Sequence, residues 1–184
     1  MLEISLLTGE LSFAGLWLLV RAVVWLRQRQ IDWKREAMLL LLFIDLAVLI
    51  RFVFYPFFPV GGRVQPLAVN LRSLAPVRLN LLPLVYIADY DTKREAVINI
   101  VGNIALFIPG GIVLPLLDRR LDRFGKAVAG GAAVSLCVEL IQLLLPNSTT
   151  DIDDLILNTL GTALGCGVYF LLRRRKGRRR PHSD

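Results

Sequence analysis

The sequence predicts an all-α protein, a polytopic membrane helical bundle of about five transmembrane helices. Composition is the first reason: 55% of the 184 residues are hydrophobic and the mean hydropathy is +0.57, which is too apolar for an ordinary soluble domain. The second reason is that apolar runs of about 20 residues recur, the length that a helix needs to cross a bilayer. These runs do not alternate apolar and polar residues, as the strands of a transmembrane barrel would.

Five segments contain these apolar runs, and we expect each to form one transmembrane helix. They are residues 4–26, 37–58, 96–117, 126–145 and 152–172. The five spans leave little chain for a separate soluble domain. The first segment lacks the basic leading residues and the small-residue cleavage site of a signal peptide, so we expect it to stay in the membrane.

Basic residues predict how these helices are oriented. The clusters between the first two spans, between the third and fourth spans, and after the fifth span all fall on one side of a five-span arrangement. The positive-inside rule then places the N-terminus outside and the C-terminus in the cytoplasm. The loop at residues 59–95 is external in this arrangement although it also carries basic residues, and its length weakens the rule there.

This arrangement divides the chain into three predicted parts. Residues 1–36 hold the first transmembrane helix and a basic cytoplasmic loop, residues 37–172 form the main membrane domain, and residues 173–184 form a basic cytoplasmic tail. We expect the tail to contact anionic membrane lipids rather than nucleic acid, because no folded nucleic-acid reader accompanies it. Near the ends of the first span, Glu10 and Arg21 are expected to reach toward the membrane surfaces.

The cysteine and histidine residues do not indicate a disulfide, a catalytic triad or a zinc site. Cys137 and Cys166 lie within predicted spans, where we expect small packing residues rather than a disulfide. The single histidine, His182, lies in the polar tail. The chain therefore offers no histidine-based triad and no histidine-ligated zinc site.

Polar and acidic residues gather at one predicted depth of the membrane, and they are the candidate site. Such groups are costly in hydrocarbon, so they are functional candidates by default. Asn99 and Asn103 are spaced to share a face of the third helix, as Glu139 and Gln142 are on the fourth. The residues that we expect to line a ligand site are Asn80, Asn99, Asn103, Glu139, Gln142, Asp151, Asp154, Asn158 and Arg51.

Helix capping offers a structural explanation for part of this set. Asp151, Asp153 and Asp154 open the fifth helix, where carboxylates favour the positive end of the helix dipole. Ser148 and Thr150 stand three residues before two of these aspartates, the spacing of a capping box. The asparagines within the spans could likewise only bond one helix to another. Both interpretations stay open for them.

Glu139 is harder to explain by structure alone. It is flanked by Val138 and Leu140 well inside a span, so it must be neutral or paired. Arg51, at a matching predicted depth in the second helix, is the partner to test first.

Small residues and proline predict local features of the backbone. The Pro109-Gly110-Gly111 sequence predicts a kink in the third helix, formed either for packing or to open backbone toward the site. The segment at residues 79–87 either lies at the membrane surface or forms an ordinary loop. Close helix approach is predicted at two pairs of small residues, namely Gly161 with Gly165 and Gly131 with Ser135.

Four segments together resemble the VanZ-like family of bacterial membrane proteins. They read NLLPL at residues 80–84, NIVGNIALFIPGG at residues 99–111, S…ELIQ at residues 135–142 and TDIDDLILNTLG…G at residues 150–165. This resemblance identifies residues 37–172 as a VanZ-like membrane domain. Relatives often carry an arginine just before the aspartate motif, whereas residues 147–150 here read NSTT. If that arginine normally pairs with a carboxylate, Arg51 or a loop arginine must replace it.

The resemblance implies a role in resistance to lipoglycopeptide antibiotics such as teicoplanin. Our leading hypothesis is a non-enzymatic protein without a cofactor, whose site binds a lipid-linked cell-wall precursor or a lipoglycopeptide at the outer leaflet.

The alternative hypothesis is a membrane-embedded hydrolase or transferase that acts on a lipid phosphate. Asp151, Asp153, Asp154 and Glu139 would then hold Mg²⁺, which prefers oxygen ligands. Glu139 and Asp154 would be the candidate catalytic residues, with Glu139 as general acid or base. A transporter is disfavoured because the chain shows no inverted repeat.

Overall fold

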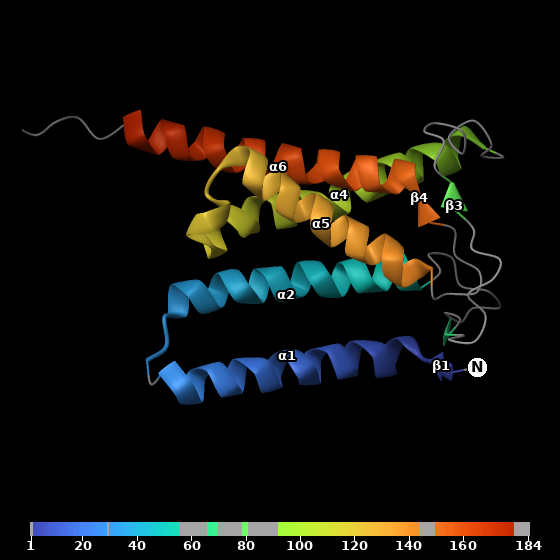
Figure 1. The fold of residues 1–184 in the computed structure, drawn as a ribbon, viewed down its shortest axis with the longest axis horizontal. Helices are drawn as coiled ribbons and strands as arrows, with labels where there is room; N and C mark the ends of the chain where they lie inside the picture. Colours follow the sequence, from blue (N-terminus) through green and yellow to red (C-terminus); the bar gives the residue numbers. More distant parts are fainter. Residues whose placement is uncertain are drawn as a thin grey trace, which may run out of the picture. The chain divides into compact units, whose positions relative to one another are not determined.

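The computed structural model describes residues 2–28, 30–55, 66–69, 79–80, 92–143 and 150–178. Within them lie five helices that are long and apolar enough to cross a membrane, which confirms the predicted fold class (Figure 1). The helices are α1 (Leu6–Gln28), α2 (Trp33–Phe54), α4 (Lys93–Leu117), α5 (Phe124–Gln142) and α6 (Ile152–Arg178). The chain is therefore a multi-pass membrane protein.

Most helix ends differ from the predicted boundaries by two to six residues, and two of these differences have a clear physical cause. α2 stops at Phe54 rather than at residue 58, because Tyr55 precedes Pro56 and adopts the extended conformation that this position favours. α6 continues to Arg178, six residues into the predicted tail. Lysine and arginine are good helix formers, and their charge favours the negative end of the helix dipole.

Short strands and one turn of 3-10 helix complete the described elements. Strand β1 (Leu2–Ile4) pairs antiparallel with β2 (Leu67–Val69), with Leu2 opposite Val69. Strand β3 (Leu79–Asn80) pairs with β4 (Thr150–Asp151). The 3-10 turn η1 (Arg119–Leu121) connects α4 to α5.

The chain forms two compact units. The first comprises Met1–Leu79 and Glu139–Thr150, and the second comprises Asn80–Val138 and Asp151–Asp184. α5 belongs mostly to the second unit, and its last turn belongs to the first.

Aromatic stacking and an ion pair join α1 to α2 in the first unit. The rings of Phe13 and Phe43 stack in parallel with their centres 5.2 Å apart, and Trp17 lies 5.3 Å from Phe43. Arg21 forms a two-point ion pair with Glu36, in which Nε donates to Oε2 over 3.1 Å. Both side chains are largely buried. The prediction that Arg21 reaches toward a membrane surface did not include this partner on α2.

Tyr55 anchors the opposite end of α1. Its hydroxyl donates to the carbonyl oxygen of Ser5 over 3.2 Å, and it lies so close to Gly9 that a Cβ there would overlap it. Burial, assisted by the charge of Glu10, raises the pKa of the Tyr55 phenol.

Glycine lets α4 and α6 lie side by side in the second unit (Figure 1). A Cβ on Gly161 would overlap the carbonyl oxygen of Ile104, and one on Gly165 would overlap that of Ile108. Small residues allow this kind of close backbone approach between transmembrane helices. The predicted role of the Gly161 and Gly165 pair is confirmed.

α4 is helical throughout Lys93–Leu117, so the Pro109-Gly110-Gly111 sequence does not break the helix, and the predicted kink stays a prediction. Gly111 serves packing, because a Cβ there would overlap the Thr162 carbonyl oxygen. Cys166 is fully buried, and its Sγ lies 3.2 Å from the carbonyl oxygen of Gly111. It is the predicted packing residue, whereas Cys137 is exposed and does not fill that role.

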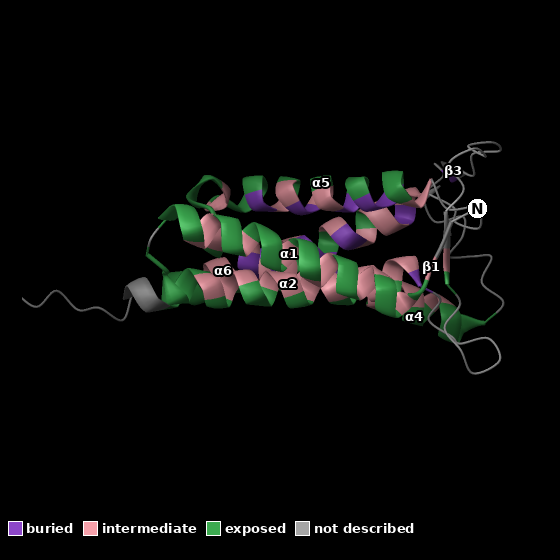
Figure 2. Cartoon of the chain, turned by 90° about the horizontal axis from the view of Figure 1, so that it is seen from below, coloured by how far each residue is buried: buried purple, intermediate pink, exposed green. Residues whose placement is uncertain are grey.

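α5 has one face of buried residues and one face of exposed residues (Figure 2). On the buried face, a Cβ on Gly131 would overlap the side chain of Thr162, so the predicted close approach at Gly131 is also confirmed. Asp122 directly follows the η1 turn. It accepts a hydrogen bond from Tyr169 over 3.3 Å and forms an ion pair with Arg173. These contacts fasten the η1 turn to the end of α6.

Candidate functional site

Asp151 begins the candidate site by capping α6. Its Oδ1 accepts the backbone N–H of Asp153 over 2.9 Å and the side-chain amide of Asn80 over 3.1 Å. Because α6 begins at Ile152, the capping position belongs to Asp151 rather than to Ser148 or Thr150. The prediction that carboxylates open this helix is confirmed, with a different residue as the cap.

Asn103 links α4 to α6 one turn further along. Its side-chain amide donates both to Oδ1 of Asp154 and, over 3.4 Å, to Oδ1 of Asn99. The structure therefore brings three of the predicted residues together and confirms that Asn99 and Asn103 share a helix face. Their polar atoms lie in spans that are otherwise apolar.

Asn158 forms a deeper polar contact between α6 and α5. Its Nδ2 donates to Oγ of Ser135 over 2.9 Å, and Thr162 Oγ1 donates to the Asn158 carbonyl oxygen over 3.1 Å. Asn158 is 3% exposed and Ser135 is 0% exposed. Within the described residues, Asn158 Oδ1 is buried and has no hydrogen-bond partner.

An unpartnered buried acceptor needs an explanation. Leaving such a group unsatisfied costs about 1–3 kcal/mol, so proteins normally supply a donor from the chain, from water or from a ligand. The Asn158 amide can accept one donor group at its Oδ1 without losing its bond to Ser135. It therefore marks a position where a hydroxyl or amide group would be stabilised.

Polar residues continue along one face of α6. Asp154, Asn158, Thr162 and Cys166 follow one another at four-residue steps, so they lie on a single face of the helix. The side chains of Asp154 and Asn158 bond to α4 and to α5 respectively. Thr162 and Ser135 were not among the predicted site residues. The four-residue spacing after Asn158 is the signal that would have found Thr162.

The other three predicted site residues belong to the first unit. Glu139 is 2% exposed, which agrees with its expected depth within a span. Gln142 has a buried Oε1 without a hydrogen-bond partner in the described part of the chain. Arg51 donates from Nη1 to the Tyr55 carbonyl oxygen over 3.4 Å, and its guanidinium lies 5.5 Å from the ring centre of Phe52. A pair between Arg51 and Glu139 stays a prediction.

The described acidic residues do not form a metal centre. No group of three or more His, Cys, Asp or Glu side chains in this part of the chain is arranged to hold a metal ion. Asp151 accepts from the N–H of Asp153 and from Asn80, and Asp154 accepts from Asn103. The Mg²⁺ site of the hydrolase hypothesis stays a prediction.

Comparison with known proteins gives two matches. The family model described as VanZ/LLP1 matches residues 18–173. "Protein VanZ" of Enterococcus faecium is 33% identical over 93 residues, which cover 50% of this chain and 53% of that protein. The chain thus spans about half the length of this curated relative. No solved structure matches the chain.

Proposed function

Because this chain belongs to the VanZ/LLP1 family, we propose that it binds an amphiphile in the bacterial plasma membrane and contributes to teicoplanin-type resistance. The ligand class is a lipid-linked cell-wall precursor or a lipoglycopeptide. Such a molecule combines sugar and peptide groups with a long hydrocarbon chain, and it is available to a site within a membrane protein. Binding alone explains this role, and we propose no chemical step.

Three polar side chains of the second unit support the proposal. We call Asn103, Asp154 and Asn158 the polar layer. The amide of Asn103 meets the carboxylate of Asp154 between apolar helices, and Asn158 keeps a buried acceptor without a donor. Hydroxyl and amide groups of a ligand would donate to these acceptors. The apolar surface of the helices would accommodate its hydrocarbon chain.

Glu139 tests the proposal in cells. Glu139 is the buried carboxylate of the predicted site that lies in the first unit, and such a group within a span is a functional candidate by default. We expect Glu139→Ala to abolish the teicoplanin resistance that we propose for the wild-type chain when it is expressed in a susceptible bacterium. Minimum inhibitory concentration is the measurement, with membrane levels of each variant checked by immunoblotting. Cys137→Ala is the matched control, since Cys137 is exposed two residues earlier on the same helix.

Two results would count against this proposal. The first is full resistance in cells that contain the Glu139→Ala variant. The second is turnover of labelled lipid phosphates by the purified wild-type protein that stops when EDTA is added, which would favour the hydrolase hypothesis.

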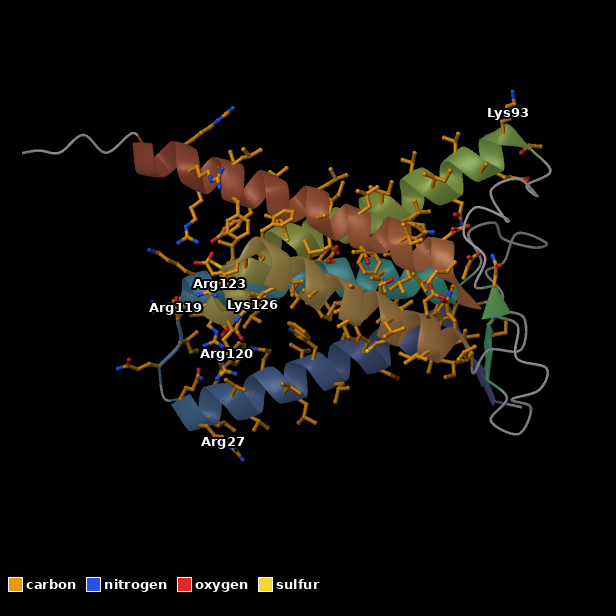
Figure 3. The ribbon with its side chains drawn as sticks, turned by 45° about the horizontal axis from the view of Figure 1, so that its top comes forward. Arg27, Lys93, Arg119, Arg120, Arg123 and Lys126 are labelled. Carbon is orange, nitrogen blue, oxygen red and sulfur yellow. The ribbon has the colours of Figure 1, made fainter. Side chains whose placement is uncertain are left out.

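We also propose that the N-terminus lies outside and the C-terminus in the cytoplasm. Lys93 and Arg123 mark opposite ends of the second unit (Figure 3). In a variant without native cysteines, an impermeant thiol reagent applied to intact cells should label Lys93→Cys and should not label Arg123→Cys. Labelling in the reverse pattern would invert the orientation. Permeabilised cells, in which both positions should react, are the control.

A further inference from the structure

Four basic residues surround the η1 turn and the start of α5 (Figure 3). We name them the basic rim: Arg119, Arg120, Arg123 and Lys126. All four are exposed, and within the described residues none of their side chains forms an ion pair or a hydrogen bond. Their charge is therefore available to a partner.

The acidic residues of this turn are already engaged. Asp122 pairs with Arg173 and accepts from Tyr169, while Asp118 accepts the backbone N–H of Arg120 over 2.8 Å and caps the turn. The ion pair also holds the end of α6 beside the turn, where Arg174 and Arg175 are exposed. The turn and the end of α6 thus form one cationic surface on the second unit.

Exposed apolar side chains lie next to this charge in the sequence and on the same helices. Phe124, between two members of the basic rim, is 49% exposed and packs its ring edge-on against Phe170, with the ring centres 6.3 Å apart. Leu116 at the end of α4 and Leu172 near the end of α6 are also exposed. Cations beside exposed apolar groups at the ends of transmembrane helices are the arrangement that suits a phospholipid, with its charged headgroup and acyl chains.

We propose that the basic rim binds the headgroups of anionic phospholipids. The phosphate oxygens accept hydrogen bonds from the arginines, and the acyl chains lie against the exposed apolar residues. Each basic residue near a membrane surface strengthens this attraction roughly fivefold. The inference is independent of the proposed function, because it concerns a different end of the second unit from the polar layer.

The opposite end of α4 offers a matched control. Lys93 and Arg94 are exposed there as well, but they stand beside Glu95 in the first turn of the helix. Changing both to Gln removes surface charge from the same unit without touching the basic rim.

The test compares binding of phosphatidylglycerol and phosphatidylcholine to the purified full chain by native mass spectrometry. We expect the wild type to prefer phosphatidylglycerol, and we expect the triple variant R119Q/R120Q/R123Q to lower that preference ~100-fold. The K93Q/R94Q control should keep it. Added salt should also weaken the preference of the wild type, a measurement that does not depend on how any variant folds.

Three results would overturn the inference. They are a wild-type chain without preference for phosphatidylglycerol, a triple variant that keeps the wild-type preference, and a control variant that loses as much preference as the triple variant.

Discussion

Gly165→Ala should destabilise the second unit strongly, whereas the same change at Gly167 should not. A Cβ on Gly165 would overlap the carbonyl oxygen of Ile108 and would lie 3.0 Å from the Cα of Gly111. Both neighbours are backbone atoms of α4, so relief requires the two helices to separate. Overpacking of this kind costs about 1–3 kcal/mol of unfolding free energy, and in lipid the helices depend on close packing to stay together.

Gly167 provides the control on the same helix. A Cβ there would meet no heavy atom within 4 Å. Alanine favours the helix over glycine by about 1 kcal/mol in soluble peptides, so Gly167→Ala should be neutral or slightly stabilising. The difference between the two variants then isolates the helix–helix contact.

Two probes separate the two units in this experiment. All three tryptophans, Trp17, Trp25 and Trp33, lie in the first unit, so their fluorescence reports on α1 and α2. Far-ultraviolet circular dichroism reports on all of the helices. Thermal unfolding in detergent should show a lower midpoint by circular dichroism for Gly165→Ala. Equal midpoints for the two alanine variants would mean that α4 and α6 do not rely on this contact.

The sequence was most informative where one local rule decides the structure. Apolar length predicted the five helices, and small residues at Gly161 and Gly165 predicted a close approach whose partner helix could not be named. Periodicity tells which residues share a face, but it does not tell which helix that face meets. This is why the pairing of Arg21 with Glu36 and the contact of Asn158 with Ser135 emerged only from the structure.

Competition between local signals explains the boundary errors. The apolar run after Phe54 favours continued helix, but Pro56 fixes Tyr55 in an extended conformation and α2 ends. In the candidate site, three aspartates and two hydroxyl residues could all have capped α6. Asp151 takes the position because it directly precedes the first helical residue, and its Oδ1 meets the N–H of Asp153.

Asn103→Leu should destabilise the protein, and adding Asp154→Leu should restore most of the loss. The single change removes the amide that donates to the Asp154 carboxylate and leaves an acceptor between apolar helices without that donor. A lost hydrogen bond of this kind costs about 1–3 kcal/mol. The double variant replaces both polar groups by apolar ones, which can be nearly neutral because no unsatisfied group remains. Unfolding of the wild type, both single variants and the double variant gives the coupling energy.

The same four proteins separate a ligand site from a structural bond between helices. If Asn103 and Asp154 contact a ligand, the double variant should regain stability and still fail to confer teicoplanin resistance, because its apolar side chains offer a ligand no hydrogen bond. Asp154→Asn is the conservative control, since its side-chain oxygen can still accept from Asn103. A stable double variant with full resistance would assign the pair to helix packing alone. The polar layer is a binding site only if the double variant regains unfolding stability without regaining resistance. Comparing the single and double variants is what separates these two effects.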